Sequence, residues 1–166
     1  VQSGKFFMRV EFDHPEGIDA FRASFAPVAD EFEMTWQLTD RIHRKKVLLL
    51  VSKFDHCLGD LLYRTSIGEL PMDVVGIVSN HEQGDLKLGF VFGVPYHHLP
   101  ITKDTKPQQE AQIKRLVEET GAELVVLARY MQILSDDMAQ FLSGRCINIH
   151  HSFLPGFKGA KPYHQA

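Results

Sequence analysis

The chain has 166 residues, of which 44% are hydrophobic and 23% are charged, so its composition is that of a soluble globular protein. This length suffices for one full domain, or one domain and part of another. A formal net charge of −3 leaves no basic excess to neutralise phosphates, which argues against a nucleic-acid partner. The two cysteines, Cys57 and Cys146, have no paired spacing, and there is no membrane-spanning run or signal-peptide pattern. We therefore expect reduced, buried thiols in a cytoplasmic protein with no membrane partner.

The amino-terminal part predicts a small strand–helix–strand unit. Residues 6–12 alternate between apolar and other side chains, which indicates a half-buried strand, and residues 34–38 repeat this pattern. Apolar residues at helical spacing predict an amphipathic helix over 18–32, with Pro27 as a local defect. Such a unit is too small to be stable alone, so we expect it to need a missing upstream half, a partner chain or the rest of this chain.

The pattern changes after a basic segment, residues 41–46, which we interpret as a solvated linker. Continuously apolar runs then predict buried strands. These runs cover residues 47–51, 74–78 and 124–127, and two further strands are predicted over residues 96–100 and 146–150. Three helices are predicted: one with Leu58, Leu61 and Leu62 on its buried face, one that follows a capping box of Thr105 and Gln108 and stops at Gly121, and one from Ser135 to Gly144. The pattern of residues 85–93 is ambiguous.

Strands that alternate with helices predict an α/β fold with a doubly wound parallel sheet. Ligands of such sheets bind at the carboxyl ends of the strands. The loop 128–134 follows one strand end, where it is either plain core or backbone that hydrogen-bonds a flat heterocycle. Asn148 and His150 lie at another strand end and, being two residues apart, share a face. An amide can hold a carbonyl oxygen that turns negative and an imidazole can transfer a proton, so this pair suits acyl chemistry.

Other kinds of site have weaker support. The nine histidines predict no metal site, because neighbours such as His97 and His98 point to opposite faces of a strand and no ligand pairs have a zinc spacing. The turn 52–59 is neither a dinucleotide fingerprint nor a P-loop, although Lys53 and the helix start leave phosphate binding open. Cys57 is either a nucleophile or, as we prefer, a small buried residue.

The string Asn148-Ile-His-His-Ser-Phe-Leu-Pro155, followed by Gly159-Ala-Lys-Pro-Tyr-His-Gln165, resembles the core of the formyltetrahydrofolate deformylases, a family of the folate-dependent formyltransferase superfamily. Residues 128–135 resemble the folate loop of that superfamily. Residues 52–62, with His-Cys-Leu-Gly-Asp-Leu-Leu at their end, resemble the first turn and helix of the deformylases. These resemblances imply a formyltransferase-like, Rossmann-type catalytic domain over residues 44–166.

The amino-terminal unit, residues 1–43, resembles the second half of an ACT domain, a small regulatory module. This likeness implies a partial ACT-like regulatory domain, an amino-acid effector and a homo-oligomer. The first half of an ACT module is absent. The family's third catalytic group is an aspartate well downstream of the Asn-x-His strand. This chain stops at Ala166, before that position. We therefore expect a fragment truncated at its carboxyl terminus, with little or no hydrolytic activity.

The resemblance implies hydrolysis of 10-formyltetrahydrofolate to tetrahydrofolate and formate, which would supply purine biosynthesis and balance one-carbon pools. Folate is then the substrate, and no cofactor or metal is implied. By position, Asn148 would hold the formyl oxygen, His150 would act as the acid/base, and Ser152 would support the site. Backbone groups of the folate loop would bind the pterin, namely those of Tyr130, Met131, Gln132, Ile133 and Leu134.

Two alternatives stay open. The first is formyl transfer to an amine, as in the glycinamide ribonucleotide formyltransferases, which hold their phosphate-bearing acceptor with a glycine-rich first turn. Residues 52–59 have no such turn, which favours water as the acceptor. The second is a non-catalytic ACT-type sensor.

Overall fold

The computed structural model describes residues 6–40, 42–88 and 93–148 of the chain. The chain divides into two compact units, which we call unit 1 (Val1–His43) and unit 2 (Arg44–Ala166). In the described parts of both units, no helix is long and apolar enough to cross a membrane.

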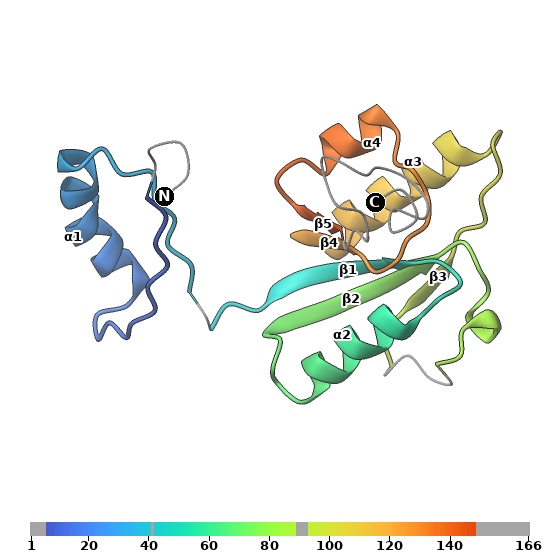
Figure 1. The fold of residues 1–166 in the computed structure, drawn as a ribbon, viewed down its shortest axis with the longest axis horizontal. Helices are drawn as coiled ribbons and strands as arrows, with labels where there is room; N and C mark the ends of the chain where they lie inside the picture. The colour runs from blue at the N-terminus through green and yellow to red at the C-terminus, as the bar shows by residue number, and fades with distance from the viewer. Residues whose placement is uncertain (1–5, 41, 89–92, 149–166) are drawn as a thin grey trace, which may run out of the picture. The chain divides into compact units, whose positions relative to one another are not determined.

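Unit 2 contains a parallel five-stranded sheet in the order β3-β2-β1-β4-β5. The strands are β1 (Lys45–Val51), β2 (Met72–Ser79), β3 (Tyr96–His98), β4 (Leu124–Leu127) and β5 (Cys146–Asn148). The helices are α2 (His56–Ser66), α3 (Lys106–Thr120), α4 (Asp136–Phe141) and the short 3₁₀ helix η1 (Gln83–Asp85). α2 covers one face of the sheet, whereas α3 and α4 cover the other (Figure 1). The predicted α/β fold with a doubly wound parallel sheet is confirmed.

The central strand β1 is apolar on both faces because helices cover both sides of the sheet. Leu48 and Leu50 pack in one cluster with Ile113 of α3 and Met138 of α4. The alternate residues of β1 pack in a second cluster on the face of α2. The members of that cluster from these two elements are Val47, Leu49, Val51, Leu58 and Leu62.

The predicted ends of two helices are confirmed. Ser135 precedes α4, and its hydroxyl accepts a hydrogen bond from the Met138 backbone N–H at 3.1 Å, as an N-cap residue should. Gly121 ends α3 with φ of 65° and ψ of 32°, a left-handed conformation that suits glycine.

The capping box predicted at the start of α3 is wrong. The Thr105 hydroxyl accepts a hydrogen bond from the Thr102 backbone N–H at 2.9 Å, and it makes no capping bond to the helix. Thr105 has φ of −100° and ψ of 0°, whereas a capping side chain requires extended backbone. The hydroxyl therefore closes the preceding turn instead.

Unit 1 contains the helix α1 (Ile18–Glu31), which confirms the helix predicted there and runs through Pro27. The strands predicted over residues 6–12 and 34–38 are wrong, because both segments have irregular backbone. Alternation shows which side of an extended segment is apolar, but a strand forms only when a neighbour supplies its hydrogen bonds. The alternation places Phe6 and Phe7 on opposite faces of the predicted strand, yet both are exposed, by 75% and 74%.

Aromatic side chains hold the segments that flank α1 against that helix. The ring of Phe12 lies 4.4 Å from that of Phe21, which stacks on Phe25 at 5.4 Å, measured between ring centroids. Phe25 in turn meets Trp36 edge-on at 5.1 Å. Unit 1 therefore has a small core in which one aromatic row replaces hydrogen-bonded strands.

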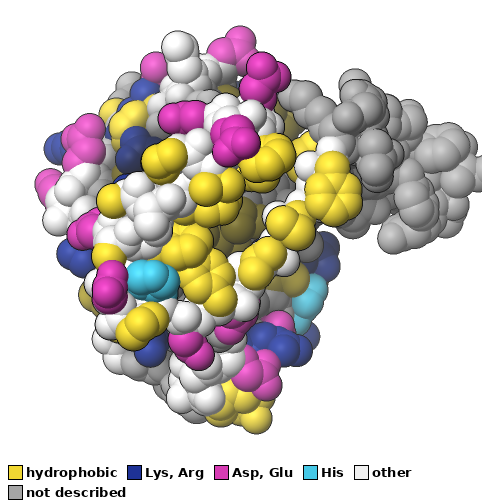
Figure 2. All heavy atoms as spheres, turned by 90° about the vertical axis from the view of Figure 1, so that its left-hand side faces the viewer, with side chains coloured by type: hydrophobic (Ala, Val, Ile, Leu, Met, Phe, Trp, Pro, Cys, Tyr) yellow, Lys and Arg dark blue, Asp and Glu magenta, His cyan; other side chains and the backbone are white. Residues whose placement is uncertain are grey.

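Many large apolar side chains of unit 1 remain in water. Met8 is 72% exposed, Val10 60% and Phe32 63%. Figure 2 shows hydrophobic side chains gathered on the face that it presents. Contiguous apolar surface of this kind usually marks a contact surface.

Candidate active site

Three strand ends meet at the carboxyl edge of the sheet in unit 2. Leu127, the last residue of β4, is paired in register with Leu50 of β1 and with Asn148, the last residue of β5. The chain leaves β4 in a loop of residues 128–135, which we call the β4–α4 loop. The beginning of this loop therefore lies beside Asn148, at the edge where parallel α/β sheets bind their ligands.

The beginning of the β4–α4 loop is fixed by Tyr130, whose side chain is 6% exposed. Its hydroxyl donates a hydrogen bond to Gln109 Oε1 of α3 at 3.0 Å, and Gln109 Nε2 donates to the Leu99 carbonyl at 2.7 Å. Burial raises the pKa of Tyr130 to about 12, so the hydroxyl keeps its proton and acts as a donor at neutral pH.

The end of the loop is fixed by Glu110, the next residue of α3. The Ser135 backbone N–H donates to Glu110 Oε1 at 2.9 Å, and the Ser135 hydroxyl donates to Glu110 Oε2 at 2.5 Å. The same hydroxyl accepts the capping bond of α4. Glu110 is 6% exposed, and a buried carboxylate needs hydrogen-bond donors. Ser135 at the end of the loop supplies them.

A third anchor comes from Ser52, which directly follows β1 and is 4% exposed. Its hydroxyl accepts a hydrogen bond from the Met131 backbone N–H at 3.0 Å and donates to Asn80 Oδ1 at 2.9 Å. Its backbone N–H donates to the Arg129 carbonyl at 3.3 Å. Ser52 thus connects the ends of β1 and β2 to the β4–α4 loop.

Between these anchors the loop presents apolar side chains to solvent. Met131 is 55% exposed and Ile133 is 86% exposed, whereas Gln132 is half-buried and Leu134 packs against the core. Exposed apolar side chains beside a fixed backbone suit a flat ligand that stacks on the loop and hydrogen-bonds its main chain.

Arg129 gives the loop a positive edge. Its φ of 59° is the left-handed region that non-glycine residues rarely adopt. Its guanidinium lies 5.2 Å from the ring centroid of Phe54, and Nη1 is 3.4 Å from His56 Nε2. Phe54 belongs to the turn between β1 and α2, which also carries the exposed Lys53, and His56 is the first residue of α2. The turn and the loop therefore meet through a cationic contact.

The predicted site residues are only partly within the described structure. Asn148 is exposed at the end of β5, whereas His150 and Ser152 lie outside the described residues. The Tyr130 side chain serves as an internal anchor. Cys57 and Cys146 are free, as predicted, but half-buried rather than buried. Burial raises the pKa of the Cys146 thiol. In the part of the chain that the structure describes, no group of three His, Cys, Asp or Glu side chains could hold a metal.

Sequence reasoning missed Ser52, Gln109 and Glu110. The two α3 residues could have been found, because Gln109 lies four residues before Ile113 and so continues the apolar stripe of the helix. A polar side chain on a buried stripe signals a specific hydrogen-bond partner. Ser52 gave no comparable signal, since a serine after a strand is usually a simple turn residue.

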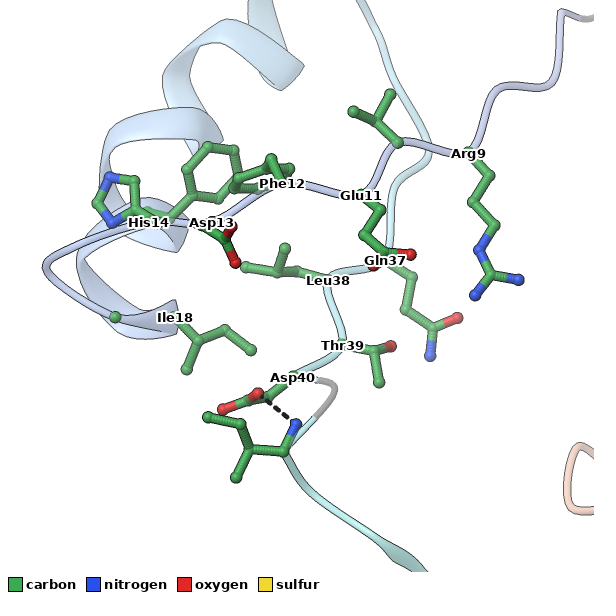
Figure 3. A pocket seen from close by; sticks show the side chains of 14 residues that line it. Arg9, Glu11, Phe12, Asp13, His14, Ile18, Gln37, Leu38, Thr39 and Asp40 are labelled. Atoms are coloured by element: carbon green, nitrogen blue, oxygen red, sulfur yellow. Dashed lines mark hydrogen bonds between the residues drawn. The ribbon is translucent and has the colours of Figure 1, made fainter. Parts of the chain in front are cut away.

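Unit 1 contains a separate cavity of about 820 Å³. It lies between residues 9–14, the first turn of α1, residues 37–40 and Ile42, and Figure 3 shows Ile18 and Leu38 projecting into the space between these segments. The Asp40 carboxylate accepts the Ile42 backbone N–H at 2.8 Å at one end of it. The lining combines apolar side chains with carboxylates and an arginine, so a small polar molecule matches it chemically.

Comparison of the sequence with known families agrees with this sheet and with the loop and strand at its carboxyl edge. A family model described as formyl transferase matches residues 45–166. The chain belongs to the formyl transferase family. The formyl transferase match begins at the first residue of β1 and covers every strand of the sheet.

The individual relatives have more specific names than the family. A formyltetrahydrofolate deformylase of Corynebacterium sp. (strain P-1) is 54% identical over 169 residues, which cover all of this chain and 59% of the relative. A crystal structure of a formyltetrahydrofolate deformylase from Pseudomonas putida KT2440 is 54% identical with a TM-score of 0.78, over 99% of this chain and 59% of that one. The predicted resemblance to the deformylases is confirmed. The chain spans less than two thirds of the length of these relatives.

A transferase with the same fold is more distant. A phosphoribosylglycinamide formyltransferase from Bacillus halodurans is 25% identical with a TM-score of 0.62, over 73% of this chain and 63% of that one. The identity to the deformylases is about twice as high.

Proposed function

We propose that the protein hydrolyses 10-formyltetrahydrofolate to tetrahydrofolate and formate. The observation that carries this proposal is the register pair of Leu127 and Asn148, which brings the β4–α4 loop next to an exposed amide at the carboxyl edge of the sheet. The proposal is also supported by the 54% identity to a deformylase along the whole chain.

In this proposal the loop backbone from Tyr130 to Leu134 binds the pterin, with Met131 and Ile133 stacking against it. The Asn148 amide donates to the formyl oxygen and stabilises the negative charge that forms when water adds to the formyl carbon. His150 accepts a proton from the attacking water and delivers a proton to the folate nitrogen as the carbon–nitrogen bond breaks, and Ser152 supports these groups. Formate and tetrahydrofolate leave, and neither a metal nor a cofactor takes part.

Water is the proposed acceptor because residues 52–59 lack the glycine-rich first turn of the transferases. The phosphate-bearing acceptor of the transferases needs such a turn to hold it, and without one water is the remaining acceptor. The second candidate function, formyl transfer, is supported by the shared fold with the phosphoribosylglycinamide formyltransferase. Formate release with and without glycinamide ribonucleotide separates the two: hydrolysis releases formate without it.

The Asn148→Ala variant tests the site, made in a protein that spans the whole length of the deformylase relatives. Removal of an oxyanion donor lowers turnover by about 10²-fold or more, so we expect formate release from 10-formyltetrahydrofolate to fall by that factor. Gln140→Ala changes an exposed amide on α4 and serves as a matched control with wild-type activity. Unchanged formate release by Asn148→Ala would remove the support for this assignment and favour a non-catalytic sensor.

For unit 1 we propose a regulatory role, as a partial ACT-like domain that binds an amino-acid effector in its cavity and contributes to a homo-oligomer. The mixed lining of the cavity and the exposed apolar surface of unit 1 support this role. The expected setting is the cytoplasm. Amino acids screened singly should raise the melting temperature of the protein if one is the effector, and Ile18→Asp, which places a charge in the cavity, should abolish that rise.

A further inference from the structure

We propose that Gln109 and Glu110 of α3 are positioning residues that fix both ends of the β4–α4 loop and thereby set its affinity for folate. This inference rests on the proposed function, because it takes that loop as the folate-binding segment. Neither residue touches the ligand in this proposal. Each acts through the loop residue that it holds.

The geometry divides the work between two adjacent side chains. Gln109 is 3% exposed, and both polar atoms of its amide are used, since Oε1 accepts from Tyr130 and Nε2 donates to the Leu99 carbonyl. A hydroxyl can donate to the amide oxygen and a carbonyl can accept from the amide nitrogen, so these partners allow one amide orientation. The ring of Tyr130 is thereby directed toward α3.

Glu110 holds the opposite end of the loop by two hydrogen bonds from Ser135. One comes from the backbone, so it fixes the main chain at Ser135 as well as the side chain. The other keeps the Ser135 hydroxyl in place to cap α4. Glu110 therefore determines where the loop stops and the helix starts.

Stability alone does not account for these two residues. The remainder of the buried face of α3 is apolar, with Ile113 and Val117 fully covered. A buried carboxylate costs free energy unless every lone pair is well satisfied, and apolar residues of similar size often stabilise a protein as much or more. Buried polar groups of this kind instead select one arrangement of the elements that they join.

The selected arrangement leaves residues 131–134 between two fixed points, with the Met131 and Ile133 side chains in solvent. A binding segment that is ordered before the ligand arrives does not lose that conformational entropy on binding. We therefore expect loss of either anchor to weaken folate binding and raise KM, with a smaller effect on kcat, since neither anchor touches the reacting atoms in this proposal.

The test measures the dissociation constant of tetrahydrofolate by calorimetry for Glu110→Ala and Gln109→Ala in the full chain. Exposed residues of the same helix provide matched controls, Glu118→Ala and Gln112→Ala. Loss of a buried hydrogen-bond partner corresponds to about tenfold weaker binding, and the controls should bind as the wild type does. Glu110→Gln can still accept the Ser135 backbone N–H, so it should restore most of the affinity.

Amide hydrogen exchange provides a readout that a general loss of stability would not produce. In Glu110→Ala, exchange at the Ser135 amide should accelerate at least tenfold, whereas the amides of β1 should keep their wild-type rates. Tetrahydrofolate affinity and Ser135 exchange that both match the wild type would overturn this inference while leaving the proposed function intact. A wild-type chain that binds no tetrahydrofolate would overturn the proposed function and this inference together.

Discussion

The Ser52 hydroxyl accepts the Met131 backbone N–H at 3.0 Å and thereby joins the end of the central strand to the loop that follows β4. The two residues are 79 positions apart in the chain, so this contact forms only in the completed sheet. The buried side chain that directly follows β1 therefore fixes one backbone group of the candidate site.

Ser52→Ala should lower the free energy of unfolding by about 1–3 kcal/mol, because it leaves the Met131 N–H and the Asn80 side chain without their buried partner. Urea unfolding measures this change. Ser66→Ala removes an exposed hydroxyl of α2 and should change stability by less than about 0.5 kcal/mol. Equal effects of the two substitutions would mean that the Ser52 contact contributes nothing.

The left-handed backbone of Arg129 predicts an unusual order of stability. Arg129→Gly and Arg129→Ala both remove the guanidinium, but only glycine adopts a φ of 59° without strain. The glycine variant should therefore be the more stable by about 1 kcal/mol. At the exposed helical position Arg115 the order should reverse, since glycine is about 1 kcal/mol worse than alanine inside a helix. The same order at both positions would contradict the strain.

Tyr130 should make the protein sensitive to alkaline conditions. Burial raises its pKa to about 12 in the folded state, against 10 for an ordinary tyrosine, so the folded state holds the proton more tightly. The stabilisation is complete below pH 10 and is lost as the pH rises toward 12. Tyr130→Phe should make the fall of the unfolding free energy in this range shallower, by up to about 1.4 kcal/mol per pH unit. A slope identical to that of the wild type would place the titration elsewhere, for example at Tyr96, whose pKa burial also raises.

Unit 1 and unit 2 should differ in hydrogen exchange. Residues 6–12 have irregular backbone and exposed side chains, so their amides should exchange within seconds at neutral pH. The amides of Leu48 to Leu50, hydrogen-bonded on both sides of β1, should be protected for hours or longer. Protection of residues 6–12 in solution would show that a partner supplies the strand that their alternation predicts.

The sequence was most informative where one pattern has one structural meaning. An unbroken apolar run such as Val47–Val51 can be satisfied only between two layers, and Gly121 matches a left-handed helix end. Together with the alternation of strands and helices along the chain, these signals predicted the parallel sheet and its flanking helices. Asn148 could be placed at a strand end for the same reason.

Features that depend on a distant partner could not be predicted. The alternation of residues 6–12 contains no information about a neighbouring strand, and Thr105 bonds backward to Thr102 because of local backbone angles. The contacts of Ser52 and Glu110 join segments brought together by the sheet. Their functional importance therefore becomes visible only when the strands and α3 are in place.

Because both faces of β1 are apolar, hydrophobic burial alone does not determine the register of β1 against its neighbouring strands. A slip by one residue would exchange the sets of side chains that enter the two clusters, but one set is leucine and the other is valine and leucine. Polar contacts at the two ends of the strand discriminate between the alignments: the Lys46 backbone N–H donates to Glu123 Oε2 at 3.1 Å, and Ser52 holds Met131. Ser52 thus orders the β4–α4 loop and also favours the native register of β1, because a shifted strand would lose its hydrogen bond with Met131.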